Sequence, residues 1–539
     1  MARAFNLADI FEVVVDAVPD RLALVAGEVR HTYRSLDERA NRLGHHLATS
    51  GVQPGQHVGI YAWNRAEWVE AMLGIYKIRA VPINVNFRYV EAELRYLFDN
   101  ADLVGLVYER GFGERVANVL ADAPRLTHLV TLDDATAEET AVPGAADYEA
   151  ALAAASPARG FAPRSGDDLY ILYTGGTTGM PKGVMWRSED IFFGALQGGN
   201  AGGAPVATVE ALARHADHDA SVSVVTAPMM HGGAQWATLI GLSNANTVVL
   251  YTGHHFDGDE IWRIVEREQA SALMMVGDAM GRPLADALAA APGVIDTSKL
   301  QVLSSGGSLL SKAVKEELRR QLPAVRVIDA FGASETGANG AVLDFDGPAA
   351  GPRFNMGDHT TVVDDDLRPL VPGSGQIGRL ARRGHIPLGY YKDEAKTATT
   401  FVHDADGVRW VLPGDMAMVE ADGAITILGR GSVCIQTGGE KVFPEEVEAA
   451  LKSHPDVFDA VVVGVPDERF VERVAAIVRP RLGRSPDLDT LADHCRTQVA
   501  GYKVPRQLQL VDDIQRTPAG KPDYRWAKAH ATRSAEGSG

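Results

Sequence analysis

The stretch TGGTTGMPKG, from Thr174 to Gly183, is the part of the sequence from which the fold is predicted. It follows an apolar run, residues 169–173, that is typical of a buried strand, and it precedes a helix expected to begin near Ser188. Glycines let a loop curl so that its backbone N–H groups face a phosphate, and the threonines and Lys182 add hydroxyl donors and a positive charge. The order strand, loop, helix therefore predicts a phosphate-binding loop in an α/β protein.

This loop differs from the common nucleoside-triphosphatase loop, because no glycine lies five residues before a Gly-Lys-Ser/Thr triplet and Pro181 directly precedes the lysine. Taken alone, a Gly- and Thr-rich segment is also compatible with an ordinary turn. As a whole, the run resembles the phosphate-binding signature of the adenylate-forming superfamily, which holds acyl-CoA synthetases, luciferases and nonribosomal adenylation domains. The resemblance implies that ATP phosphates are bound by Thr174, Gly175, Gly176, Thr177, Thr178, Gly179 and Lys182.

Length, charge and cysteine content narrow the class of protein. A chain of 539 residues is too long for a single core, so two or more domains are expected. The formal net charge of −18 argues against a nucleic-acid-binding surface, and phosphate ligands therefore need local cations. Two cysteines, Cys434 and Cys495, give neither a disulfide framework nor a metal-site spacing. A poor signal-peptide pattern and the lack of any run near the roughly 20 apolar residues of a spanning helix favour a cytoplasmic protein without a membrane span.

Apolar periodicity predicts the secondary structure along the chain. In the first 110 residues strands and helices alternate, which favours a parallel sheet with helices on its faces. We expect strands at 57–62, 80–85 and 103–108, a helix capped by Ser35 with Glu38, a helix capped by Asn64 or Glu67 and a helix at 92–98. The alternation resumes at Val222, and after Val371 glycine turns and short strands predict an antiparallel subdomain.

The predicted fold class is α/β. A large N-terminal domain, residues 1–428, contains parallel-rich sheets flanked by helices plus the small antiparallel subdomain. The sequence GRGS at 429–432 is the expected hinge, and a small mobile α+β domain follows at 433–530. In that domain we expect helices at 444–453 and 488–500. The polar tail, residues 531–539, is expected to be disordered.

The segments SSGGS, residues 304–308, and FGASETG, residues 331–337, are separated by one strand-helix unit. Either segment alone is compatible with a polar turn at a strand end. They resemble the adenine and magnesium segments of the superfamily, which implies that Phe331 stacks on the adenine, that Gly306 and Gly307 pass along its edge, and that Glu335 and Thr178 hold Mg²⁺. The same resemblance implies further nucleotide contacts from Ser308, Asp329, Gly332, Ser334, Thr336 and Ile427.

Two later motifs resemble the ribose clamp and the catalytic lysine of the superfamily. Asp415, in the turn PGD, and Arg430, in the hinge sequence, are the implied partners of the ribose hydroxyls, although an Asp in such a turn is often only a turn residue. Lys521, in RTPAGKPDYRW, matches the lysine that stabilises charge as the substrate carboxylate attacks the α-phosphate. The alternative interpretation of this segment is a solvated basic tail.

The segment TGGEKVFPEEVE, residues 437–448, resembles the loop that replaces the lysine loop after the small domain rotates. Gly438, Gly439 and Lys441 are the residues that the resemblance assigns to the coenzyme A step. The chain departs from the family pattern at Ser432 in the hinge, at Gln436, and at Val471-Glu472, where relatives usually have Gly-Glu. None of these departures removes a group needed for adenylation, and each bears on the thioester step.

The segment MMHGGAQW, residues 229–236, occupies the place where the family lines its acyl pocket, and the predicted acyl contacts are Met230, His231, Gly232, Gly306 and Ala333. His231 is the expected gate, with a structural histidine as the alternative. The small and flexible residues indicate a roomy apolar pocket for a fatty acid or a steroid side-chain acid. The predicted enzyme is an AMP-forming acyl-CoA synthetase that uses ATP, Mg²⁺ and CoA, with a homodimer as a family expectation. Loading of a separate carrier protein and a silent nucleotide- or acyl-binding module are the alternatives.

Overall fold

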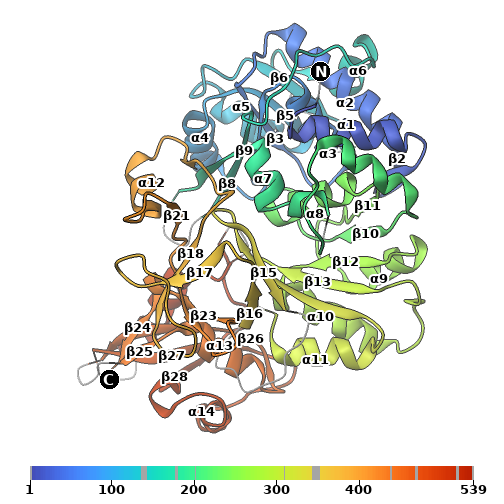
Figure 1. Ribbon diagram of the computed structural model, residues 1–539. Coiled ribbons are helices and arrows are strands. Elements are labelled where there is room, and N and C mark those ends of the chain that lie inside the picture. The colour runs from blue at the N-terminus through green and yellow to red at the C-terminus, as the bar shows by residue number, and fades with distance from the viewer. Residues whose placement is uncertain are drawn as a thin grey trace.

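The computed structural model describes residues 3–134, 142–175, 180–200, 202–308, 310–342, 353–437, 440–467, 471–517 and 521–536 (Figure 1). The first sheet has the strand order β4 (Val81–Asn84), β3 (His57–Tyr61), β5 (Leu103–Glu109), β6 (His128–Leu132) and β7 (Ala146–Asp147), and all neighbours are parallel. Helices α3 (Ala66–Lys77), α4 (Glu91–Asn100) and α5 (Gly113–Leu120) connect these strands, while α2 (Tyr33–Ser50) precedes β3 in the chain and α6 (Tyr148–Ala154) follows β7. The predicted alternation of strands and helices is confirmed.

Two predicted helix caps are wrong. Thr32 caps α2, because its side chain accepts a hydrogen bond from the N–H group of Ser35, so the helix begins before the predicted capping box. Asn64 does not cap α3: its side chain donates to the carbonyl groups of Ala227 and Tyr251. Its role is to tie two strand ends together. Helix α1 (Leu7–Ala17) packs against α2 and α3, where the buried Lys77 bridges two carboxylates.

The largest sheet joins a parallel half to an antiparallel half. Its parallel strands follow the order β1 (Leu22–Ala26), β11 (Thr247–Leu250), β10 (Val222–Val225), β12 (Ala272–Met275), β13 (Val302–Gly306) and β14 (Arg326–Ala333), with β2 (Val29–Thr32) antiparallel at the edge. Helices α8 (Gly232–Ser243), α9 (Gly258–Arg267), α10 (Gly277–Ala290) and α11 (Lys312–Gln321) connect them. The ends of β10, β12, β13 and β14 therefore meet at one edge of the sheet, where open α/β sheets bind ligands.

The antiparallel half begins earlier than predicted, at Gly337 instead of after Val371. It contains β15 (Gly337–Val342), β16 (Arg353–Met356), β17 (Thr360–Val363), β18 (Gly378–Arg382), β20 (Phe401–His403), β21 (Arg409–Val411), β22 (Asp415–Val419) and β23 (Ile425–Arg430). The Gly- and Ala-rich sequence of β15 gave no apolar alternation from which this strand could be recognised. The short helix α12 (Glu394–Thr400) lies between β19 (Gly389–Tyr390) and β20 in the chain.

A strand that was not predicted separates the phosphate loop from the predicted helix. The loop is followed by a strand, β9 (Lys182–Arg187), which pairs antiparallel with β8 (Leu169–Thr174) and with β19 (Gly389–Tyr390). Helix α7 (Ser188–Gly194) follows that strand and begins at the predicted residue, Ser188. Val184 and Trp186 alternate into the core, which is why this stretch is extended. Strands β8 and β9 thus form an antiparallel pair that the loop connects, and in the described part of the chain no helix begins directly after the loop.

The C-terminal domain has a sheet in the order β25 (Glu440–Val442), β24 (Ile435–Thr437), β27 (Val471–Pro480) and β26 (Val457–Asp467), with β28 (Gln507–Leu510) parallel to β27. Helices α13 (Pro444–Lys452) and α14 (Leu488–Arg496) share one core with it, and α15 (Tyr524–Glu536) packs in another. Buried Ala527 and Ala531 anchor α15, so the expected disorder from residue 531 is wrong as far as Glu536. Figure 1 shows this domain below the antiparallel half of the large sheet.

Irregular connections complete the described chain. The 3₁₀ turns are η1 (Arg110–Phe112), η2 (Gln197–Gly199), η3 (Val209–Asp217), η4 (Gly431–Val433) and η5 (Gly501–Lys503). His215, in η3, bonds through its ring to the Gly199 carbonyl at 2.8 Å, which is a structural contact. None of the described helices combines the length and the apolar character that crossing a membrane requires.

Val471 occupies a backbone conformation that favours glycine. Its φ is +71°, and its side chain is 70% exposed, so no packing compensates the strain of a β-branched residue there. We expect Val471→Gly to raise the free energy of unfolding by about 1 kcal/mol, measured by urea denaturation. Val371→Gly is the matched control, because Val371 is equally exposed and lies outside the left-handed region; it should be neutral or destabilising. A lower free energy of unfolding in Val471→Gly would show that the backbone of Val471 is not strained.

Candidate active site

Lys521 is the residue around which the candidate site assembles. Lys521 is exposed as a whole residue, yet burial of its ammonium group by the surrounding protein lowers the pKa of that group. Arg430 lowers this pKa further, whereas Glu335 and Asp415 act in the opposite direction. Four charged groups therefore lie close enough to interact: Lys521 from the C-terminal domain, Glu335 from the β14–β15 turn, and Asp415 and Arg430 from β22 and β23. Residues predicted from four separate motifs thus come together in one place.

Glu335 is held in place by a tyrosine that sequence reasoning missed. The Tyr390 hydroxyl donates to Glu335 Oε1 at 3.0 Å, and Tyr390 itself is buried on β19. Burial, together with the negative charge of Glu335, raises the pKa of this tyrosine. The other Glu335 oxygen has no hydrogen-bond partner among the described residues. One free carboxylate oxygen fits Mg²⁺, which commonly uses one or two carboxylates and completes its shell with water and phosphate oxygens.

We expect Tyr390→Phe to slow the predicted adenylation step about tenfold while the fold is kept, because the change removes only the hydroxyl that orients Glu335. The Mg²⁺ concentration that gives half-maximal pyrophosphate exchange should rise with it. Tyr391→Phe is a matched control, since its hydroxyl donates to Asp102 instead. An equal effect of both changes would show that the Tyr390 hydroxyl has no special part in the site.

Asp415 and Arg430 are cross-strand partners in the register of β22 and β23. Arg430 Nε lies 3.7 Å from Asp415 Oδ1. Burial raises the pKa of Asp415, and the Arg430 charge opposes this shift. A buried carboxylate beside a guanidinium group can accept hydrogen bonds from two vicinal hydroxyls, so the geometry is compatible with the predicted ribose clamp.

The base of the phosphate loop is described, but its tip is not. Thr174 and Lys182 face each other in the hairpin register, at the two ends of the loop. The predictions for Gly176, Thr177, Thr178 and Gly179 lie outside the described residues. Lys182 forms an ion pair with Asp393, the N-cap of α12, a partner that the sequence did not reveal. A phosphate ligand would have to compete with this carboxylate for the lysine.

The predicted adenine segment divides into open and buried positions. Phe331 is partly exposed on β14 and packs against Phe354, with ring centroids 5.1 Å apart. Gly306 ends β13, and the exposed Gly307, with φ at +81°, and Ser308 follow it. Ser334 stands in the β14–β15 turn, where its carbonyl accepts from the Trp186 indole. These positions are accessible from the edge where the strands end.

The other predicted contacts have structural partners. Asp329 is buried and binds Lys315 Nζ at 3.0 Å, and the hydroxyl of the buried Thr336 accepts from the Ala333 N–H group. Ile427 is buried beside Phe331 in the core of the antiparallel half. Burial argues against direct side-chain contact with a nucleotide at these three positions. Gly332 is required by the strand pairing, because a Cβ there would lie 2.4 Å from the Gly337 carbonyl oxygen.

His231, the predicted gate of the acyl pocket, is the N-cap of α8. The Met230 carbonyl before it accepts from Asn84 at 2.7 Å, and the same amide donates to the Tyr173 carbonyl. Asn84 thus fixes the start of α8 relative to the phosphate hairpin, although it belongs to no motif. Beyond His231, a Cβ on the exposed Gly233 would meet the end of the Met274 side chain at 3.4 Å, which indicates open space lined by a flexible thioether.

The imidazole of His231 is expected to be neutral throughout the physiological range. Burial lowers the pKa of His231 to about 4, and the positive charges of Arg88 and Lys521 contribute to the shift. Because this pKa lies below the unfolded value, the neutral ring persists as the pH falls from 7 to 5. NMR of ¹⁵N-histidine-labelled protein, with His231→Asn to assign the signal, should show no protonation of this ring above pH 5. Titration near pH 6.5 would contradict the placement beside the two cations.

Of the residues predicted for the coenzyme A step, Lys441 is the one that the structure describes. Lys441 is exposed on β25, opposite Gln436. It is not among the charges that shift the pKa of Lys521, Asp415 or His231. Gly438 and Gly439 lie outside the described residues. The described residues of the C-terminal domain thus place Lys521, and not Lys441, beside Glu335 and Asp415.

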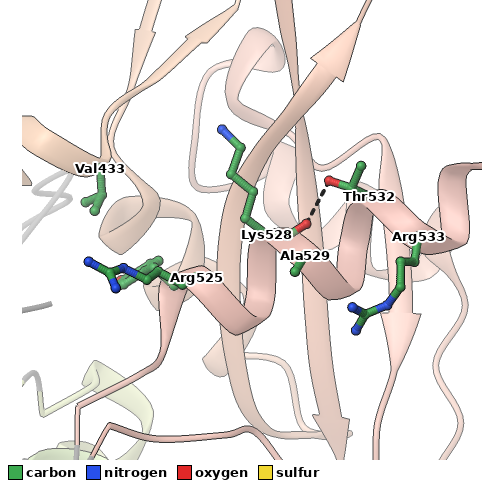
Figure 2. A pocket seen from close by; sticks show the side chains of 7 residues that line it. Val433, Arg525, Lys528, Ala529, Thr532 and Arg533 are labelled. Carbon is green, nitrogen blue, oxygen red and sulfur yellow. Dashed lines mark hydrogen bonds between the residues drawn. The ribbon is translucent and has the colours of Figure 1, made fainter. Parts of the chain in front are cut away.

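A hollow of about 550 Å³ lies elsewhere, along the outer side of α15 next to Val433 (Figure 2). It is lined by Val433, Tyr524, Arg525, Lys528, Ala529, Thr532 and Arg533. In Figure 2 the side chains of Arg525, Lys528 and Arg533 project from the helix, and the Thr532 hydroxyl donates to the Lys528 carbonyl. None of the predicted site residues lines this hollow, so it is separate from the candidate active site.

Comparisons with known proteins show the family. Residues 11–391 match the family of AMP-binding enzymes, and residues 446–521 match the AMP-binding enzyme C-terminal domain. The chain therefore belongs to the AMP-binding enzyme family.

Two curated relatives cover almost the whole chain. The medium/long-chain-fatty-acid--CoA/3-oxocholest-4-en-26-oate--CoA ligase of Mycolicibacterium smegmatis is 51% identical over 97% of this chain and 96% of its own length. The 3-oxocholest-4-en-26-oate--CoA ligase of Rhodococcus rhodochrous is 49% identical, over 97% of this chain and 96% of its own. The fold is similar to the crystal structure of the anthranilate CoA ligase AuaEII in complex with anthranoyl-AMP, with a TM-score of 0.86, 22% identity and 99% of each chain covered.

Proposed function

We propose that this enzyme joins a hydrophobic carboxylic acid to coenzyme A in two steps: ATP and the acid form an acyl-adenylate and pyrophosphate, and CoA then displaces AMP. The observation that carries the proposal is the convergence of Lys521, Glu335, Asp415 and Arg430 in one place. Membership of the AMP-binding enzyme family supports it, as do the relatives that are named as CoA ligases.

In the first step a carboxylate oxygen of the acid attacks the α-phosphorus, and the bond from that phosphorus to the β-phosphate bridging oxygen breaks. Asp415 and Arg430 hold the ribose, and Lys521 stabilises the negative charge that gathers on the α-phosphate. Thr178 and Glu335 would hold Mg²⁺, which when bound neutralises phosphate charge. The neutral His231 stands where the carboxylate enters, so no imidazolium charge competes with Lys521 for it.

In the second step the CoA thiolate attacks the acyl carbon, the carbon–oxygen bond to AMP breaks, and AMP leaves. Because Lys521 occupies the candidate site in the present arrangement, the C-terminal domain has to turn at residues 429–432 to admit the thiol. Gly438, Gly439 and Lys441 are the residues proposed to enter in its place. ATP and CoA as substrates are consistent with a cytoplasmic enzyme. The homodimer remains a prediction.

The acid is proposed to be a fatty acid or a steroid side-chain acid. The open space at Gly233 and the adjoining Met274 and Met280 side chains give an apolar, adaptable wall. The relatives' names cover both classes of acid. Sequence reasoning found no cation waiting for a second carboxylate, and Arg88, whose charge acts on His231, supports a cation near the proposed acyl site.

The test is mass-spectrometric detection of acyl-CoA and AMP after the protein is mixed with ATP, Mg²⁺, CoA and a panel of short, long, aromatic and steroidal acids. Acyl-CoA from the long or steroidal acids, absent without ATP, is the expected result. Acyl-adenylate without thioester would instead favour transfer to a carrier protein, and ATP binding without turnover would favour a silent module.

A further inference from the structure

We propose that Glu445 is a positioning residue for the first half-reaction. As a neutral carboxylic acid it docks the C-terminal domain on β23. The orientation of that domain, and with it the balance of the two half-reactions, therefore responds to pH. The inference rests on the proposed function, and it concerns a residue of the segment 437–448 to which no role has been given above.

The carboxyl group of Glu445 is packed against the backbone next to the hinge. Glu445 lies in the first turn of α13, in the C-terminal domain. Its Oε1 accepts a hydrogen bond from the backbone N–H group of Arg430 at 3.4 Å. Its Oε2 is inaccessible to solvent and has no hydrogen-bond partner in the described part of the chain. A Cβ on Gly429 would lie 2.2 Å from that oxygen, so only glycine leaves room for the carboxyl group. The contact joins the rotating domain to the strand that carries the ribose clamp.

The charges around this carboxyl group disfavour its ionised form. Glu448 follows it on α13 and Asp415 faces it from β22, while the Arg430 guanidinium is directed to Asp415. Burial raises the pKa of Glu445 to about 8, and the Glu448 charge adds to this shift. The remaining titratable groups within reach are Tyr524 on α15 and Cys434 after η4. No lysine or arginine side chain of the described residues pairs with the Glu445 carboxyl group, which is therefore protonated near neutral pH.

Rotation of the C-terminal domain would carry Glu445 away from Gly429 and into water. There its pKa would return to the ordinary glutamate range, near 4.3. Between that value and about 8 the docked state holds one proton more than the undocked state, so docking weakens as the pH rises, by up to about tenfold per pH unit. Low pH favours the orientation with Lys521 in the candidate site, and high pH favours release for the second step.

The test compares wild type with Glu445→Gln and Glu445→Ala between pH 6 and 8.5. Two rates are measured: ATP–pyrophosphate exchange, which reports acyl-AMP formation, and conversion of added acyl-AMP and CoA to acyl-CoA. In wild type the ratio of the first rate to the second should fall as the pH rises. Glu445→Gln, which stays neutral, should flatten this dependence, and Glu445→Ala should lower the first rate about tenfold with the second rate kept. Glu114→Gln, on the exposed face of α5, is the control and should follow wild type.

A pH dependence of the ratio in Glu445→Gln that equals that of wild type would overturn the proposal. The domain orientation is measured separately by energy transfer between dyes on E316C in α11 and D489C in α14, both exposed. The docked fraction should fall with pH in wild type and stay constant in Glu445→Gln; identical curves would also overturn the proposal. If neither half-reaction occurs in wild type, the proposed function fails, and the energy-transfer curves still decide the role of Glu445.

Discussion

Lys521→Ala is expected to slow acyl-AMP formation by about 10²–10³, because the change removes the cation that stabilises the α-phosphate as the carboxylate attacks. The structure places this ammonium group among Arg430, Glu335 and Asp415. The same cation has no part in the second step, for which the domain turns away. Conversion of synthetic acyl-AMP and CoA to acyl-CoA should therefore change less than threefold.

The two half-reactions are measured by ATP–pyrophosphate exchange and by single-turnover conversion of acyl-AMP. Lys528→Ala is the matched control, since Lys528 lies on the neighbouring helix α15, is exposed and pairs only with Glu472 among the described residues. It should leave both rates unchanged. Equal losses in both half-reactions of Lys521→Ala would contradict a role confined to adenylation.

Glu335→Gln is expected to lower acyl-AMP formation by a similar factor, about 10²–10³, for a different reason. The amide keeps the size of the side chain and can still accept from Tyr390, so the turn between β14 and β15 should keep its shape. What is lost is the negative charge that the proposal assigns to Mg²⁺. The apparent affinity for Mg²⁺ should therefore fall much further than in Tyr390→Phe.

This prediction is checked by titrating Mg²⁺ in the pyrophosphate exchange assay and by measuring thermal unfolding of each variant without ligands. Unchanged unfolding together with a shifted Mg²⁺ curve is the expected pattern. A Mg²⁺ curve identical to that of wild type would show that Glu335 does not hold the ion, whatever happens to the maximal rate.

Local apolar patterns predicted most of the fold, and tertiary context explains the errors. The alternation of strands and helices was predicted correctly because each element buries one face, and the spacing of apolar residues on that face differs between strands and helices. The strand β9 was missed because Gly183 and Lys182 were interpreted as part of the loop, although Val184 and Trp186 already alternate into the core. The start of the antiparallel half was missed because β15 is built from small residues whose place is set by β14 and β16.

The candidate site was predictable where a motif carries it. Glu335, Asp415, Arg430 and Lys521 were identified from separate motifs, and the structure brings them together. Tyr390, Asn84 and Arg88 were not identifiable, because each acts through a contact between segments far apart in the sequence. Asp329 shows the opposite error: it stands next to a motif, but its partner is Lys315 in the core.

The central claim, acid activation through an acyl-adenylate, is tested most directly by following an ¹⁸O label from the carboxylate of a long-chain or steroid acid. If a carboxylate oxygen attacks the α-phosphorus, and the thiolate of CoA then breaks the carbon–oxygen bond, one ¹⁸O atom must appear in AMP for each acyl-CoA formed. Mass spectrometry of the AMP should show this single label. Label in inorganic phosphate, with ADP as the product, or unlabelled AMP alongside acyl-CoA, would contradict the account.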